Sequence, residues 1–219
     1  MPTWEKIYKA KNKGGKDWQK LRDGVTPFCF IEEVSPEFSK FIKQTKLTKK
    51  HVLDIGCGQG RYLVYLSSLG FQTDGVDSSQ TAVKMTKKAL GKKTGRIWRA
   101  DMFKMKIPQN KYDLIISIST VQHGPKKDLQ KLINNIHQSL LPDGQAFISI
   151  PDQGALKIWR TCKKYKRLNK NTVVPLVGPE IGTPHSFYSK AEIRKIFSQF
   201  AKLKMTKNKH GQWSVIGTK

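Results

Sequence analysis

Residues 52–60 place one acid and three glycines where they could bind a small charged ligand. Asp54 stands near the end of an apolar run, and Gly56, Gly58 and Gly60 follow it at alternate positions. The run predicts a buried strand, and the amphipathic segment after the glycines predicts a helix. Because glycine lacks a Cβ, the loop lets a ligand lie against the backbone. An acid aimed into such a loop would repel a pyrophosphate but suits an ammonium group, although Asp54 could instead organise the loop as an Asx turn.

A second acid follows at the end of the next predicted strand. Asp77, in Gly-Val-Asp-Ser, lies about 20 residues beyond the glycine loop, where an acid accepts hydrogen bonds from ribose hydroxyls. Its alternative role is to cap the helix that follows. The dinucleotide fingerprint would need its third glycine one place later, where Arg61 stands, so a nicotinamide cofactor is disfavoured.

In this order, the D-x-G-x-G-x-G loop and the acids after it resemble the class I S-adenosylmethionine (SAM)-dependent methyltransferases, over residues 50–150 and weakly beyond. The resemblance implies that Asp54 contacts the SAM amino group and that Asp77 contacts the ribose. It also implies that Asp101 meets the adenine amine, with Met102 along the ring, although Asp101 could be only a turn acid. The cofactor contacts that the resemblance implies are Asp54, Gly56, Cys57, Gly58, Gly60, Asp77, Ser78, Asp101, Met102 and Ser119.

The acceptor side of the expected site follows the fourth predicted strand. Gln122 and His123 match the polar pair that many small-molecule methyltransferases carry here, and the (D/N)-P-P-(Y/F/W) tetrad of amino-group and amide methyltransferases is missing. His123 could act as a base or orient the acceptor, or it could only brace the loop. In related enzymes the region of residues 178–188 closes the pocket, which makes His185 a second acid–base candidate and Tyr188 a substrate contact.

A basic segment, Lys157–Lys170, holds seven basic residues and no acid. Its helical spacing predicts a basic amphipathic helix laid on the domain, which could hold phosphate or another anion, or could be a solvated face. The chain carries a net charge of +25, and residues 151–219 hold 15 basic and 3 acidic residues. A field of this sign attracts nucleic acid, acidic membranes or anionic substrates. A general bias towards lysine explains the charge equally well.

Strand-like and helix-like segments alternate over most of the chain, which predicts a parallel sheet with helices on both faces. We therefore expect one doubly wound, Rossmann-like α/β domain over residues 1–219, with a seven-stranded sheet whose last strand is antiparallel. It would comprise an N-terminal cap segment (1–50), a SAM-binding core (51–150), a substrate-side insertion (151–188) and a C-terminal helix and hairpin (189–219). The expected strands lie near 51–55, 72–76, 95–100, 113–118, 144–150, 201–206 and 212–217, and the expected helices near 60–69, 79–90, 126–140 and 190–199.

The composition predicts a cytoplasmic protein. No apolar run approaches the roughly 20 residues that a membrane span requires, and the N-terminus lacks the apolar stretch of a secretory signal. Cys29, Cys57 and Cys162 are scattered, with no C-x-x-C. Neither a disulfide framework nor a zinc site is therefore expected from the cysteines.

The function that the resemblance implies is transfer of a methyl group from SAM to a small, anionic acceptor. Because this cofactor is already activated, alignment and exclusion of water should supply most of the rate, and no metal is expected. The runner-up is a tRNA or rRNA methyltransferase that uses the basic last third of the chain. A SAM-binding protein without catalysis is a weaker alternative, because Asp54, Asp77 and Asp101 are all intact.

Overall fold

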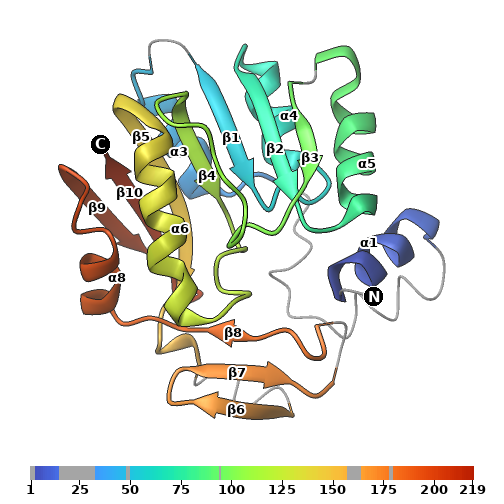
Figure 1. Ribbon diagram of the computed structural model, residues 1–219, viewed down its shortest axis with the longest axis vertical. Helices are drawn as coiled ribbons and strands as arrows, with labels where there is room; N and C mark the ends of the chain where they lie inside the picture. The colour runs from blue at the N-terminus through green and yellow to red at the C-terminus, as the bar shows by residue number, and fades with distance from the viewer. Residues whose placement is uncertain (1–2, 15–32, 48–49, 94, 157–163, 178–179) are drawn as a thin grey trace.

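The main sheet has seven strands at the centre of the molecule (Figure 1). The computed structural model describes residues 3–14, 33–47, 50–93, 95–156, 164–177 and 180–219. The strands of the main sheet are β1 (His51–Ile55), β2 (Gln72–Asp77), β3 (Ile97–Arg99), β4 (Tyr112–Ser117), β5 (Leu140–Pro151), β9 (Lys202–Lys207) and β10 (Gln212–Thr218). Their order is β3-β2-β1-β4-β5-β10-β9, and β10 runs antiparallel to both of its neighbours. The predicted fold class, including the antiparallel last strand, is confirmed.

Helices cover both faces of this sheet because each central strand buries alternate residues on opposite sides. Val52 packs with the helices of one face, whereas Leu53 packs with those of the other. The first group is α3 (Pro36–Gln44), α4 (Arg61–Ser68) and α5 (Gln80–Leu90), and the second is α6 (Lys126–Ser139) and α8 (Lys190–Ile196). In Figure 1, α6 and α8 lie in front of the sheet, and α3 and α4 lie behind it. Among the described residues, none of the helices has the length and apolar character that crossing a bilayer requires.

The predicted helix boundaries follow from local capping. Ser79 caps α5, since its Oγ accepts a hydrogen bond from the Ala82 N–H. Ser189 and Glu192 form a capping box at the start of α8, which begins where the helix near 190–199 was expected. The main strand that differs is β5, which begins at Leu140 rather than at residue 144. An irregularity lies within β5, where its pairing with β4 shifts register.

The long connection after β5 contains a second, smaller sheet that the sequence did not predict. Its antiparallel strands are β6 (Tyr165–Asn169), β7 (Thr172–Pro175) and β8 (His185–Ser186). The predicted basic helix over Lys157–Lys170 is therefore wrong from residue 164 onward, and residues 157–163 lie outside the described residues. A tight turn follows the basic segment, and in it the Asn171 N–H donates a hydrogen bond to Asn169 Oδ1. This turn folds the basic segment back onto β7, whose Val173 is buried, so the segment becomes a strand instead of a helix.

Helix α1 (Thr3–Lys13) lies against the N-terminal end of α5 (Figure 1). Glu5 makes this contact: its carboxylate accepts hydrogen bonds from the Ser79 hydroxyl at 2.6 Å and the Thr81 hydroxyl at 2.7 Å. The Ser79 hydrogen bond is the main reason that the pKa of Glu5 falls to about 2, although burial opposes the fall. A carboxylate is also favoured at this position by the dipole of α5.

We expect Glu5→Gln to loosen α1 from the domain, because the neutral amide loses the charge that these donors favour. Amide hydrogen exchange over residues 3–13 should be faster than in the wild type, and exposed Glu33→Gln is the matched control. Since the folded pKa of Glu5 is lowered, its stabilisation is present above the unfolded value of about 4.5 and is lost as pH falls towards about 2. The difference in unfolding free energy between wild type and Glu5→Gln should therefore shrink over that range. Equal exchange in both variants would contradict the anchoring role.

Candidate active site

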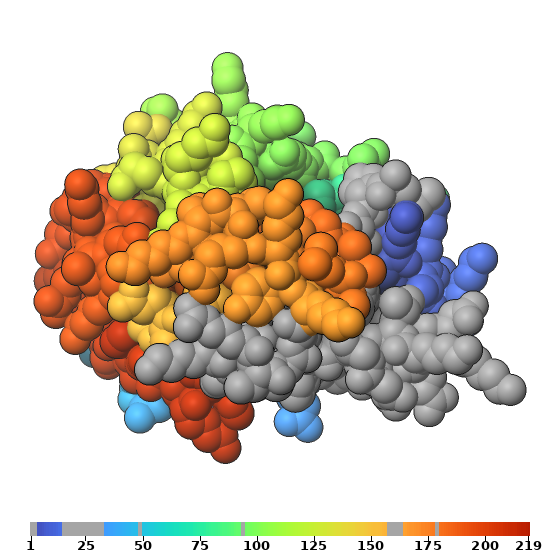
Figure 2. Space-filling model, turned by 90° about the horizontal axis from the view of Figure 1, so that it is seen from below, coloured from blue at the N-terminus to red at the C-terminus, as the bar shows by residue number. Residues whose placement is uncertain are grey.

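A cavity of about 540 Å³ lies at the carboxyl ends of the parallel strands. Its walls come from the loops after β1 to β4, from α1 and from the region of the small sheet. Figure 2 views this end of the molecule from below, with residues of the small sheet (orange) across the middle of the face. The volume is typical of sites that enclose a small molecule, and the position is the one where open α/β sheets bind ligands.

The glycine loop after β1 forms one wall of the cavity. Gly56 and Gly58 have φ angles of +79° and +58°, which other residues rarely adopt. A Cβ on Gly56 would lie 2.2 Å from Thr120 Cγ2, so no side chain fits there. Two N–H groups, those of Gly56 and Cys57, donate to the carbonyl of Val76 and hold the loop against β2. The result is a turn of bare backbone at the cavity wall.

Asp54 and Asp77 line the same part of the cavity, and both are buried. Burial raises the pKa of the Asp54 carboxyl to about 8, while Arg61 opposes the rise and Asp77 adds to it. A cationic group beside Asp54 would favour its charged form. Asp77 accepts hydrogen bonds from the N–H groups of Gly58 at 3.0 Å and Ser79 at 2.8 Å. These bonds oppose the rise in its pKa that burial causes. Asp77 does not cap α5, because Ser79 does.

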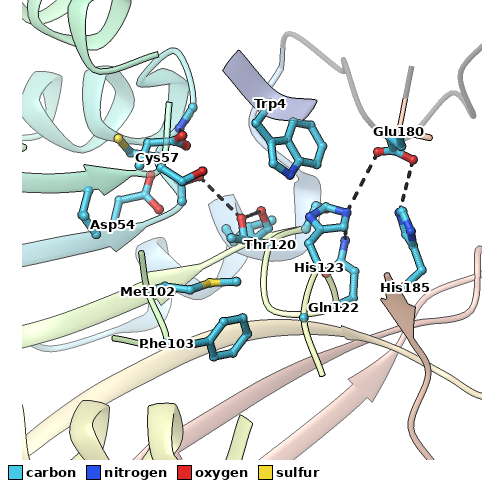
Figure 3. Close-up of a pocket in the computed structure, with 18 of the residues that line it drawn as sticks. Trp4, Asp54, Cys57, Met102, Phe103, Thr120, Gln122, His123, Glu180 and His185 are labelled. Atoms are coloured by element: carbon cyan, nitrogen blue, oxygen red, sulfur yellow. Dashed lines mark hydrogen bonds and ion pairs between the residues drawn. The ribbon is translucent and has the colours of Figure 1, made fainter. Parts of the chain in front are cut away.

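Asp101 lines the cavity from the loop after β3, and about half of its side chain is exposed. Its Oδ1 accepts a hydrogen bond from the Phe103 N–H at 2.9 Å, so it does organise a turn. Met102 and Phe103 line the cavity next to it, and Figure 3 shows both side chains beneath the opening. The turn and the cavity wall are thus formed by the same residues.

Two histidines and a glutamate form a buried cluster on the other side of the cavity. His185 Nε2 lies 3.2 Å from Glu180 Oε2, and His123 Nε2 lies 4.0 Å from Glu180 Oε1. The two imidazole ring centres are 4.7 Å apart, and the indole of Trp4 lies 4.8 Å from the His123 ring. Figure 3 shows these four side chains gathered together, with Asp54 across the opening. Burial, reinforced by His185, lowers the pKa of His123 to about 3 although Glu180 opposes it.

The small sheet is tied to the loop after β4, and this contact positions the cluster. The Ser186 N–H donates to the carbonyl of Gln122 at 2.9 Å, and the Ser186 hydroxyl donates to the carbonyl of Gly124 at 2.9 Å. These bonds place His185 beside His123, although 61 residues of chain separate them. The side chain of Gln122 is also buried, and its Nε2 lies 3.4 Å from His123 Nε2.

Most of the residues predicted for the site meet in this one cavity. Gly60 and Tyr188 do not line it: Gly60 is the N-cap of α4, and Tyr188 is buried in the core. We therefore do not propose a substrate contact for Tyr188. The predicted residues that line the cavity are Asp54, Gly56, Cys57, Gly58, Asp77, Ser78, Asp101, Met102, Ser119, Gln122, His123 and His185.

Three of the cavity residues that the sequence did not predict show why it missed them. Glu180 stood in the region predicted to close the pocket, but only the fold brings it to His123. Trp4 belonged to an aromatic N-terminal segment that offered no register for a specific contact. His210, which had been given no role, reaches the cavity from the turn between β9 and β10.

Residues 52–144 match the family model described as a methyltransferase domain. The ubiquinone biosynthesis O-methyltransferase of Coxiella burnetii is 27% identical over 136 residues, which cover 61% of this chain and 56% of that protein. The chain thus spans about half the length of the curated relatives it matches.

Two solved structures share the fold over nearly the whole chain. A protein from Pyrococcus horikoshii gives a TM-score of 0.71 at 16% identity, and the match covers 100% of this chain and 95% of that protein. Magnesium protoporphyrin IX methyltransferase from Synechocystis, solved with bound SAH, gives a TM-score of 0.64 at 18% identity and covers 99% and 93%.

With the fold and the cavity, these matches make residues 52–144 a methyltransferase domain with the fold of the class I SAM-dependent methyltransferases, and they support SAM as its cofactor. The described residues fit this cofactor. Gly56, Cys57 and Gly58 line the cavity beside Asp54, and buried Asp54 is a carboxyl group that an ammonium group would stabilise in its charged form. Backbone N–H groups already orient the carboxylate of Asp77 at the end of β2.

Proposed function

We propose that the protein transfers a methyl group from SAM to an oxygen atom of a small, aromatic, anionic acceptor. The observation that carries this proposal is the buried cluster of His123, Glu180 and His185, which faces the same cavity as the glycine loop. It supplies polar groups for one acceptor atom in surroundings that otherwise suit an apolar ring. Trp4 and Phe187 contribute aromatic surface to those surroundings.

The curated relatives support an oxygen acceptor, because their names describe O-methyltransferases of ubiquinone biosynthesis. A negative charge on the acceptor is supported by the chain's net charge of +25, since a field of this sign attracts anions. Lys11 and Lys104 are among the cavity-lining residues that would pair with it.

In this mechanism SAM supplies an activated methyl group when it is bound. Asp54 binds the amino group of the cofactor, Asp77 binds its ribose hydroxyls, and Asp101 with Met102 binds its adenine. His123 and His185 contact the acceptor and fix the direction of its reacting atom, and Trp4 in α1 helps to exclude water. Such alignment is the main source of rate when the transferred group is already activated.

The alternative, an RNA methyltransferase, has no comparable support. It rests on the basic last third of the chain, in which residues 165–169 form strand β6 rather than part of the expected helix. The curated relatives named above carry no RNA substrate in their names.

A labelling experiment tests the proposal. Protein incubated with a cell extract and methyl-labelled SAM should transfer label to a small molecule that passes a size filter and resists nuclease. Asp77→Ala, in which cofactor binding should be weakened, controls for other methyltransferases in the extract. Label found only in nuclease-sensitive RNA would overturn the proposal, and Lys166→Gln with Arg167→Gln would then be expected to reduce that labelling.

A further inference from the structure

His123, Glu180 and His185 offer three ligand atoms that all lie within 4.8 Å of one another. The exposed fractions of the three side chains are 8%, 3% and 5%, so the ligand atoms lie out of bulk water. Two separate parts of the chain supply them: the loop after β4 and the segment that leads into β8. The hydrogen bonds of Ser186 to Gln122 and Gly124 hold these parts together. The cluster is thus assembled by the fold.

The hydrogen bonding of His185 determines what its second nitrogen can do. Its Nδ1 lies 2.9 Å from the carbonyl oxygen of Thr183, so Nδ1 carries the proton and donates it to that oxygen. Its other nitrogen, Nε2, faces Glu180 Oε2 at 3.2 Å, so both atoms are placed to bind one ion. An imidazole that donates one N–H to a backbone carbonyl and binds an ion through the other nitrogen is the usual arrangement at metal sites.

Two imidazoles and one carboxylate are a ligand set that transition metals prefer. Zinc sites of the His₂Glu type bind the ion at about 2.0–2.2 Å from each ligand atom and keep one position open. For a tetrahedral ion that bond length separates the ligand atoms by about 3.3 Å. His185 Nε2 and Glu180 Oε2 are 3.2 Å apart, which is close to this value. The other ligand atoms lie at most 4.8 Å apart, so a small rotation of the side chains would bring them to it. Magnesium is a poor match, because it prefers oxygen ligands.

Gln122 supplies a second, independent observation at the same place. Its Oε1 is buried, and among the described residues it has no hydrogen-bond partner. Its Nε2 lies 3.4 Å from His123 Nε2, so turning the amide over would bring the oxygen to that position. A cation bound at His123 Nε2 would give this buried oxygen a partner.

We propose that His123, Glu180 and His185 bind a divalent transition-metal ion of the zinc type on the acceptor side of the cavity. The open side of the ion would face the cavity, where the proposed function puts the acceptor's oxygen atom. The role of the ion in methyl transfer therefore rests on the proposed function, whereas its binding does not. This proposal departs from the expectation from sequence that the site holds no metal.

Metal titration of the full chain tests the proposal directly. Protein freed of metal with a chelator should bind one Zn²⁺ per chain by calorimetry. Bound Co²⁺ should give the visible absorption of a four- or five-coordinate ion with nitrogen ligands. Glu180→Gln and His185→Ala should each weaken binding at least a hundredfold and should abolish the absorption. His137→Gln is the matched control, since His137 lies on α6 outside the cavity, and it should leave both measurements unchanged.

Absence of stoichiometric binding in the wild type would overturn the proposal, as would equal Co²⁺ spectra in wild type and His185→Ala. Circular dichroism would show whether a variant is folded, and the wild-type titration decides the matter if both variants unfold. SAM binding and methyl transfer would be measured in the same samples. If the protein binds the metal but transfers no methyl group, the proposed function is wrong and the metal site stands. If the protein transfers methyl groups but binds no zinc, the metal site is wrong and the proposed function stands.

Discussion

Replacing His123 with alanine should lower kcat about a hundredfold while changing SAM affinity little. The ring lies on the acceptor side of the cavity, across from Asp54 and the glycine loop (Figure 3). Loss of a group that aligns the reacting atom costs about this much even when the displacement of the acceptor is only about 1 Å. Steady-state kinetics with the acceptor identified by labelling, together with calorimetry of SAM, would separate the two effects.

His185→Ala should behave in the same way, because the two rings share Glu180. The matched control is His137→Gln, which alters a histidine outside the cavity. If His123→Ala loses SAM affinity and turnover in equal proportion, the ring acts on the cofactor, and its role in aligning the acceptor is wrong.

Asp77→Ala should weaken SAM binding roughly ten- to a hundredfold. A hydrogen bond to a charged group is worth about 1.5–3 kcal/mol, and each 1.4 kcal/mol is about a factor of ten in affinity. Two backbone N–H groups donate hydrogen bonds to the Asp77 carboxylate and fix it at the cavity wall. The carboxylate is therefore oriented to accept further hydrogen bonds from the ribose hydroxyls. Calorimetry of SAM with wild type and variant would measure the loss.

The conservative control is Asp77→Asn, which keeps an oxygen for the loop but removes the charge. Its loss of affinity should be smaller than that of Asp77→Ala. The thermal unfolding curve of each variant would show whether the glycine loop has stayed folded. Unchanged affinity in a folded Asp77→Ala protein would reduce Asp77 to a purely structural residue of this loop.

The core of the fold was predictable because its signals are local. An apolar run followed by glycines predicted β1 and α4, and the helix expected near 190–199 begins at Lys190 as α8. The order of these elements then predicted the sheet and gathered Asp54, Asp77 and Asp101 at one end of it. Parallel strands end at the same edge, so their terminal acids meet there whatever the rest of the chain does.

The acceptor side was less predictable because long-range contacts build it. The basic residues before Asn169 have helical spacing, but pairing with Val173 and its neighbours makes them a strand. Glu180 joins His123 only because Ser186 binds the loop after β4. Likewise, Trp4 reaches the cavity because Glu5 binds Ser79, more than 70 residues away. No local pattern encodes such pairings. The division of the chain into cap, core, insertion and hairpin, and its cytoplasmic location, stay predictions.

Calorimetry with three ligands tests the central claim most directly. We expect the wild-type protein to bind one SAM or one S-adenosylhomocysteine per chain and not to bind NAD. This follows from the acid before the glycine loop, the spacing of the glycines and the buried carboxylate of Asp77. Binding of NAD without binding of SAM would contradict it.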